Sequence, residues 1–215
     1  MIAINCKTYK ESSGSNAITL AKFCEEVGKE KHVDFLVCVP AIDLKETARA
    51  VHIPVYVQHA DFSLPGKSTG SITLEAVKEA GAAGVLLNHS EKQISDETIA
   101  KTITRAHELK LKVLLCANTP EKGKELAQYN PDFIAVEPPE LIGGKISVSQ
   151  AKPEVITKTV ELLGESMKGR ILVGAGIQNA EDVRIAAKLG AAGVLLASSV
   201  TLAKDQKAAI EGLLT

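Results

Sequence analysis

The chain has 215 residues, with 25 Lys and Arg against 26 Asp and Glu, so its formal net charge is −1. This balance leaves no basic excess for binding nucleic acid or an anionic membrane surface, and 3% aromatic residues with no Trp argue against base stacking. Hydrophobic residues at 45% are ordinary for a globular protein and exclude a disordered or collagen-like chain.

The four cysteines, Cys6, Cys24, Cys38 and Cys116, form no CxxC pair and share no metal-binding spacing with His. We therefore expect reduced, buried thiols, no metal site, and a cytoplasmic location. The N-terminus does not resemble a signal peptide, and no apolar run approaches the ~20 residues that span a bilayer.

Eight short apolar runs, rich in Leu and β-branched residues, are predicted to be strands. They are Ile2–Asn5, Phe35–Pro40, Ile53–Val57, Val85–Asn88, Lys112–Cys116, Phe133–Glu137, Arg170–Gly174 and Val194–Ala197. Their apolar character is nearly continuous, which is typical of parallel strands that are buried on both faces.

Segments with a period of 3.6 residues alternate with these runs and are predicted to be helices. They are Ala17–Val27, Asp43–Val51, Leu74–Ala80, Glu97–Leu109, Glu121–Tyr129, Glu154–Leu163, Ala180–Leu189 and Thr201–Leu213. Several have a candidate N-cap, namely Ser15, Asp43, Thr73, Ser95, Thr119 and Asn179.

Strict alternation of strand and helix predicts an α/β protein with a parallel sheet, either a closed (β/α)8 barrel or an open doubly wound sheet. The sequence 81–87, GAAGVLL, recurs at 190–196, and each copy leads into and includes the start of a predicted strand, the fourth and the eighth. Such a repeat favours a closed ring, in which these strands lie opposite each other. It indicates either duplication of a half-barrel or the same tight turn used twice. We expect one barrel domain over residues 1–215.

In closed barrels of this type the active site lies at the C-terminal ends of the strands. The candidate residues there are Asn5, Lys7, His89, Ser90, Glu91 and Glu137, with the small-residue turns Gly174-Ala175-Gly176 and Ala197-Ser198-Ser199. A lysine, a histidine and two carboxylates at one opening indicate acid–base chemistry. The small residues suit a phosphate, because backbone N–H groups can approach its oxygens there.

Glu137 is followed by two prolines, an apolar stretch and the pair Gly143-Gly144. This pattern is typical of a stiff flap between a rigid and a flexible hinge, which would close over a substrate next to the base. The alternative is an ordinary strand-to-helix loop with a solvated Glu.

Taken together and in order, these motifs resemble a known family. They are Asn5-Cys6-Lys7, Thr69-Gly70, Asn88-His89-Ser90-Glu91, the flap Val136–Gly143, and the pair Val173–Ile177 and Gly193–Ser198. From about residue 2 to residue 203, the chain resembles triosephosphate isomerase of the short archaeal type. The resemblance implies interconversion of glyceraldehyde 3-phosphate and dihydroxyacetone phosphate in a TIM barrel, without a metal or an organic cofactor.

The resemblance also implies roles for individual residues. Glu137 would be the general base that moves a proton between C1 and C2, and His89 the neutral electrophile that donates a hydrogen bond to the substrate oxygens. We expect a short helix beginning at Ser90-Glu91 to lower the pKa of His89. Lys7 would balance the negative charge of the enediolate, paired with Glu91, while Asn5 would orient Lys7 and touch the substrate.

The phosphate would be bound by backbone amides of three loops, which map to Gly143, Gly176, Ala197 and Ser198, with Ile142 and Gly174 also at the substrate. Two positions depart from the family pattern. Lys145 replaces a glycine in the second flap hinge, and Ser199 stands where short relatives usually have Gly. If the backbone at Ser199 needed a positive φ, the serine would cost roughly 1 kcal/mol.

The family also implies a homo-oligomer, because its third loop reaches the neighbouring active site, and Thr69-Gly70 matches the tip of that loop. A tetramer is favoured, with a dimer as the alternative, and phosphorylated trioses are the expected ligands. Two other functions remain open from the residues. One is an aldolase or lyase in which Lys7 forms a Schiff base, and the other is a catalytically silent scaffold.

Overall fold

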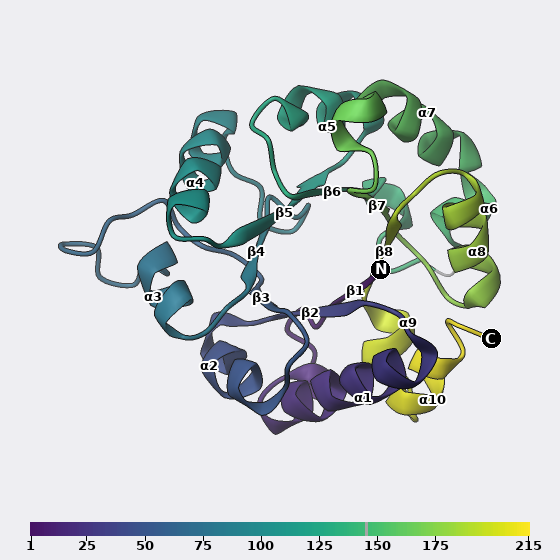
Figure 1. The fold of residues 1–215 in the computed structure, drawn as a ribbon, viewed down its shortest axis with the longest axis horizontal. Helices are drawn as coiled ribbons and strands as arrows, with labels where there is room; N and C mark the ends of the chain where they lie inside the picture. Colours follow the sequence, from purple (N-terminus) through teal and green to yellow (C-terminus); the bar gives the residue numbers. More distant parts are fainter. Residues whose placement is uncertain (145) are drawn as a thin grey trace.

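The computed structural model of the protein describes residues 1–144 and 146–215. Eight parallel strands, hydrogen-bonded in chain order with β8 returning to β1, close into a barrel with the helices outside it (Figure 1). The strands are β1 Ile2–Asn5, β2 Phe35–Val39, β3 Val55–Val57, β4 Gly84–Leu87, β5 Lys112–Ala117, β6 Phe133–Val136, β7 Ile171–Val173 and β8 Gly193–Leu196. The predicted closed barrel is confirmed, and the open sheet is excluded.

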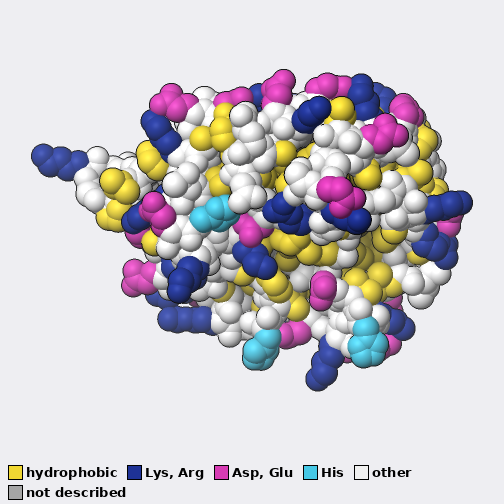
Figure 2. Space-filling view, turned by 45° about the horizontal axis from the view of Figure 1, so that its top comes forward, with side chains coloured by type: hydrophobic (Ala, Val, Ile, Leu, Met, Phe, Trp, Pro, Cys, Tyr) yellow, Lys and Arg dark blue, Asp and Glu magenta, His cyan; other side chains and the backbone are white. Residues whose placement is uncertain are grey.

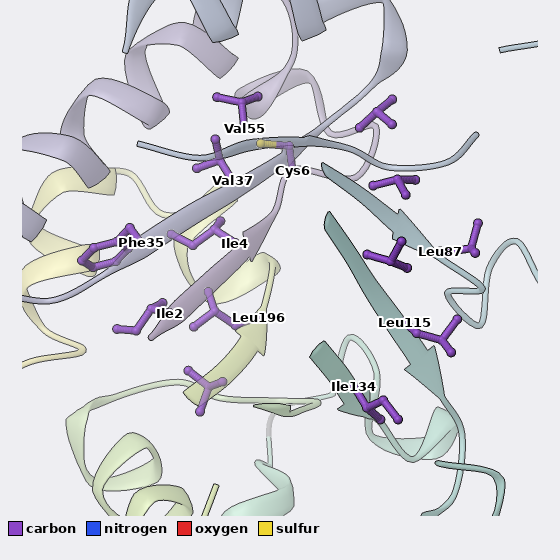
Figure 3. Packing of buried hydrophobic residues seen from close by; sticks show 14 of the residues in the cluster. Ile2, Ile4, Cys6, Phe35, Val37, Val55, Leu87, Leu115, Ile134 and Leu196 are labelled. Atoms are coloured by element: carbon purple, nitrogen blue, oxygen red, sulfur yellow. The ribbon is translucent and has the colours of Figure 1, made fainter. Parts of the chain in front are cut away.

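Side chains of the strands alternate between two buried layers, as the pleat of a strand requires. Ile4 and Val37 belong to the outer layer (Figure 3), which packs against helix residues such as Leu20. Ala3, by contrast, belongs to a separate cluster inside the barrel. That inner cluster consists of Ala3, Leu36, Cys38, Tyr56, Leu86, Leu114, Cys116, Ala135, Leu172 and Leu195. Burial on both faces explains why the runs are continuously apolar.

The helices of the ring lie close to the predicted ranges. They are α1 Ser15–Lys31, α2 Ala41–Ala50, α3 Leu74–Glu79, α4 Asp96–Glu108, α5 Pro120–Ala127, α7 Pro153–Leu163 and α8 Ala180–Lys188. The predicted helix over residues 201–213 is wrong as one element, because it divides into α9 Ser198–Thr201 and α10 Gln206–Glu211. The break occurs where the side chain of Asp205 accepts the N–H of Ala208 and caps a new helix.

Four of the predicted N-caps, Thr73, Ser95, Thr119 and Asn179, accept a backbone N–H as expected. The other two predictions are wrong. Ser15 is the first residue of α1 itself, after Gly14, and Asp43 lies inside α2. The Asp43 carboxylate instead accepts the N–H of Gly14, so it stabilises the start of the neighbouring helix.

The short helix α6, Val148–Ala151, was not predicted; it follows the flap and begins after the N-cap Ser147. Three 3-10 helices were not predicted either, namely η1 Lys10–Ser12, η2 Pro139–Leu141 and η3 Gly164–Met167. Each has only three or four residues, too few to show a helical period.

The repeated sequence GAAGVLL forms the same helix-to-strand turn twice. Gly81 has φ +95° before β4, and Gly190 has φ +99° before β8. The second glycine of each copy is also required, since a Cβ at Gly84 would lie 2.4 Å from the Lys112 carbonyl oxygen and one at Gly193 would lie 2.1 Å from that of Met1. The glycines of both copies are therefore required by the turn, as the tight-turn interpretation predicts.

Candidate active site

The alternation inside the barrel carries polar side chains to its C-terminal opening. Ala3 points inward, so Asn5 and Lys7 follow on the same side, and Ala135 is followed in the same way by Glu137. One pocket at this opening brings together most of the predicted site. Its lining includes Asn5, Lys7, His89, Glu137, Ile142, Gly143, Gly176, Ala197 and Ser198.

Two predicted residues lie beside this pocket. Glu91 lines an adjoining hollow, together with Lys7 and His89. Gly174 is not part of the pocket lining and instead packs against the predicted base. A Cβ at this position would lie 2.6 Å from Glu137 Oε1, so the glycine leaves room for the carboxylate.

Glu137 is a buried carboxyl group, only 6% exposed. Burial raises the pKa of Glu137 to about 7 from its ordinary value of 4.5, while the nearby charge of Lys7 acts in the opposite direction. The side chain has one thiol neighbour, Cys116, whose Sγ lies 3.8 Å from Oε2. A carboxyl group with a pKa near 7 is a stronger base than an exposed glutamate and can both take and return a proton at neutral pH.

The imidazole of His89 is held in its neutral form by a backbone group. The N–H of Glu91 donates to His89 Nδ1 at 3.2 Å, so the remaining ring proton lies on Nε2. Nε2 is 3.7 Å from Glu137 Oε2, on the side of the pocket. Burial lowers the pKa of His89, partly opposed by the Glu91 charge, and Lys7 lowers it further.

The expected helix at Ser90-Glu91 is wrong. These residues form a turn, and α4 begins only at Asp96, so no helix begins at the predicted position beside the ring. The neutral state of His89 instead follows from burial and from the N–H that Nδ1 accepts.

Lys7 has φ +50°, a left-handed conformation that is unusual for a residue with a side chain. Its N–H donates to Asn5 Oδ1 at 3.0 Å, and its carbonyl oxygen accepts from Gln58 Nε2 at 2.9 Å. Its ammonium group lies 2.6 Å from Glu91 Oε1. The backbone and the side chain of Lys7 are therefore both held by hydrogen bonds, and Asn5 contributes one of them.

Gln58, which lines the adjoining hollow, and Asn88, which was quoted only as part of a motif, received no role of their own in the sequence analysis. Gln58 Nε2 also donates to the Cys38 carbonyl oxygen and to Asn5 Oδ1. Asn88, with φ +61°, donates to the Cys116 carbonyl oxygen and accepts the N–H of Ile94. The available signal was position, because Gln58 lies two residues after Tyr56 and Asn88 two residues after Leu86, both of which point into the barrel.

Another part of the pocket lining comes from three loops, which contribute Gly143, Gly176, Ala197 and Ser198. Gly143 and Gly176 have φ +71° and +74°, and a Cβ at Gly176 would lie 2.4 Å from the Ile146 carbonyl oxygen. Ala197 is the N-cap of α9 and Ser198 its first residue, and the first amides of a helix lack acceptors within it. This part of the lining presents the backbone expected around a phosphate.

The two departures from the family pattern have different outcomes. Ser199 lies within α9 and is not among the residues with positive φ, so the expected strain is absent. Lys145 lies outside the described residues.

Within residues 1–144 and 146–215, no group of three or more His, Cys, Asp or Glu side chains is arranged to hold a metal ion. No helix in this part of the chain is long and apolar enough to cross a membrane.

Comparison with known proteins agrees with this geometry. The family model described as triosephosphate isomerase matches residues 1–213. The chain belongs to the triosephosphate isomerase family. It is 49% identical to the triosephosphate isomerase of Methanothermus fervidus, covering 100% of this chain and 97% of the relative. It is 45% identical to that of Methanocaldococcus jannaschii, covering 100% and 98%, and 42% identical to that of Pyrobaculum arsenaticum, covering 95% and 92%.

The resemblance to triosephosphate isomerase is therefore confirmed, and so is the predicted isomerase activity. The family's reaction is the interconversion of two triose phosphates. The alternatives of a Schiff-base lyase and a silent scaffold do not agree with this membership.

Proposed function

We propose that the chain interconverts D-glyceraldehyde 3-phosphate and dihydroxyacetone phosphate with Glu137 as the single base. Glu137 removes a proton from one carbon of the substrate and returns it to the neighbouring carbon, through an enediolate. The observation that carries this assignment is the pairing of a buried carboxyl group, with its pKa near 7, and a neutral imidazole whose Nε2 lies 3.7 Å away. The two groups can reach adjacent atoms of one small substrate.

His89 and Lys7 stabilise the charge that develops on the substrate oxygens. His89 donates from Nε2, and as a neutral imidazole it can give a hydrogen bond without transferring a full positive charge. Lys7 supplies that positive charge from a backbone fixed by Asn5 and Gln58. The 2.6 Å contact with Glu91 favours an electrostatic ammonium over a Schiff-base amine.

The substrate phosphate lies against the backbone of Gly143, Gly176, Ala197 and Ser198, a part of the pocket lining that we call the phosphate wall. Ile142 and Gly143 belong to the flap, which runs from Val136 through the prolines 138 and 139 to Gly143. Closure of this flap would bring Ile142 over the substrate and exclude water from the proton transfer.

We also propose that the chain functions in the cytoplasm as a homo-oligomer, with a tetramer favoured over a dimer. The loop that carries Thr69-Gly70 projects from the barrel beyond α3 and α4 (Figure 1), and it exposes Phe62 and Leu64. In the space-filling view, hydrophobic side chains are visible on this projection (Figure 2). Exposed apolar side chains on a projecting loop suit a contact with a second copy.

The four buried free cysteines support the cytoplasmic location, because unpaired thiols are typical of a reducing compartment.

The experiment is a coupled spectrophotometric assay of glyceraldehyde 3-phosphate isomerisation. We expect fast turnover by the wild type and a loss of several orders of magnitude in kcat for Glu137→Gln. Glu165→Gln is the matched control, because Glu165 is an exposed residue of η3 whose carboxylate forms an ion pair with Lys168. Near-native turnover of folded Glu137→Gln would refute the assignment of the base. Loss of wild-type activity after borohydride reduction with substrate would instead favour a Schiff base on Lys7.

A further inference from the structure

Asp182, in the first turn of α8, is a carboxylate with 0% exposure that lies outside the pocket lining. Its Oδ1 accepts hydrogen bonds from Ser147 Oγ at 2.7 Å and Gln150 Nε2 at 2.6 Å. Its Oδ2 accepts the backbone N–H of Gln178 at 2.8 Å. All three donors are neutral, and none of the salt bridges among the described residues includes Asp182.

The donors come from two segments that meet at the phosphate wall. Ser147 and Gln150 belong to the flap anchor, residues 146–151, where the chain leaves the flap and enters α6. Gln178 ends the phosphate loop, residues 175–178, which follows β7. Asp182 thus holds both segments from a third element, α8.

Other contacts place the two segments directly against each other. The N–H of Val148 donates to the Ala175 carbonyl oxygen at 2.9 Å. The space beside Gly176 is filled by the Ile146 carbonyl oxygen, which leaves no room for a side chain there. A small displacement of the flap anchor would therefore shift the backbone of Gly176.

Asp182 has no cationic partner among the described residues, and a buried charge without one is costly unless hydrogen bonds satisfy it. An ionised carboxylate only accepts hydrogen bonds and has about four acceptor positions, so it can bind donors from two segments at once. The Asp182 carboxylate accepts the backbone N–H of Gln178 with Oδ2 while it accepts hydrogen bonds from Ser147 and Gln150 with Oδ1.

We propose that Asp182 is a positioning residue for substrate phosphate. By joining the flap anchor to the phosphate loop, it fixes the backbone of Gly176 where the phosphate binds. This inference rests on the proposed function, because it requires a phosphorylated substrate at that wall. Asp182 has no hydrogen bond to Glu137, His89 or Lys7, so its effect should depend on the phosphate and leave the acid–base groups intact.

The test compares kcat/KM for glyceraldehyde 3-phosphate with kcat/KM for glyceraldehyde, which lacks the phosphate. For Asp182→Ala we expect a loss of about tenfold or more with the phosphorylated substrate, mainly through a higher KM, because displaced binding groups lose their contacts. The value for glyceraldehyde should stay within about twofold of the wild type, since no acid–base group is displaced.

Asp132→Ala is the matched control. The Asp132 carboxylate also accepts a backbone N–H, that of Val113, but it lies before β6 at the other end of the barrel. Both substrates should be turned over normally by this variant. If Asp182→Ala does not fold, Ser147→Ala removes one donor from the flap anchor and should show a smaller loss with the same preference for glyceraldehyde 3-phosphate.

Equal loss with both substrates, or no loss with either, would overturn the role of Asp182. If the wild type does not isomerise glyceraldehyde 3-phosphate, the proposed function itself is refuted, and the proposed role of Asp182 is refuted with it. The wild-type measurement therefore separates the two failures.

Discussion

Replacement of Glu137 by Gln should stabilise the protein at alkaline pH while it abolishes turnover. The carboxyl group has a pKa of about 7 in the folded protein, compared with an ordinary value of 4.5, because it is buried. The folded state therefore binds this proton more tightly than the unfolded state, and the stability contributed by the group falls as pH rises from about 4.5 to about 7. At about 1.4 kcal/mol per pH unit, the full loss is about 3 kcal/mol.

A glutamine side chain at this position would be neutral at every pH and would not incur this loss. The free energy of unfolding of Glu137→Gln should therefore match that of the wild type near pH 4.5 and exceed it by about 3 kcal/mol at pH 8.5. The assay is urea unfolding of both proteins at the two pH values and at one protein concentration, because association affects apparent stability. An equal difference between the two proteins at both pH values would refute the argument that Glu137 is destabilised by burial.

Three further predictions concern the groups around the base. Glu137 must be ionised to accept a proton. In a pH–rate profile, kcat/KM of the wild type should therefore rise about tenfold per pH unit below a midpoint near 7 and level off above it. A midpoint near 4.5 would contradict this expectation. Gln58→Leu removes the donor to the Lys7 carbonyl oxygen and should lower kcat by about tenfold or more in steady-state assays. An unchanged kcat would show that this hydrogen bond is not needed to position Lys7. Glu91→Gln should change the free energy of unfolding, measured by urea titration, by less than about 1 kcal/mol, because the Glu91 side chain is 57% exposed. A larger change would mean that the ion pair with Lys7 stabilises the fold.

The sequence was sufficient for the barrel and for the ends of its strands. Continuous apolar runs and alternating helical segments specify a parallel barrel, and each run was found within about two residues of its strand. Residues two positions beyond an inward side chain, such as Asn5 and Glu137, then lie at the opening. The same rule would have indicated Gln58, but its three acceptors come from different segments, so sequence spacing alone did not reveal them.

The cause of the neutral imidazole could not be predicted. A polar pair after a strand suggested a helix at Ser90-Glu91, yet the backbone turns there and the N–H of Glu91 meets His89 Nδ1. Backbone conformation in a loop of this length depends on tertiary contacts, such as those of Asn88 with the Cys116 carbonyl and the Ile94 N–H. The network around Asp182 was hidden for the same reason, because its partners lie up to 35 residues away in the chain.

Glu137 is proposed to carry the proton between the two carbons of the substrate. Isomerisation in D2O, followed by NMR, tests this role most directly, because a carboxyl group that exchanges with solvent delivers deuterium to one carbon of the product. We predict deuterium at that carbon with the wild type and with Glu165→Gln, and neither product nor exchange above the uncatalysed rate with Glu137→Gln. Deuterium incorporation by folded Glu137→Gln at the wild-type rate would contradict the claim.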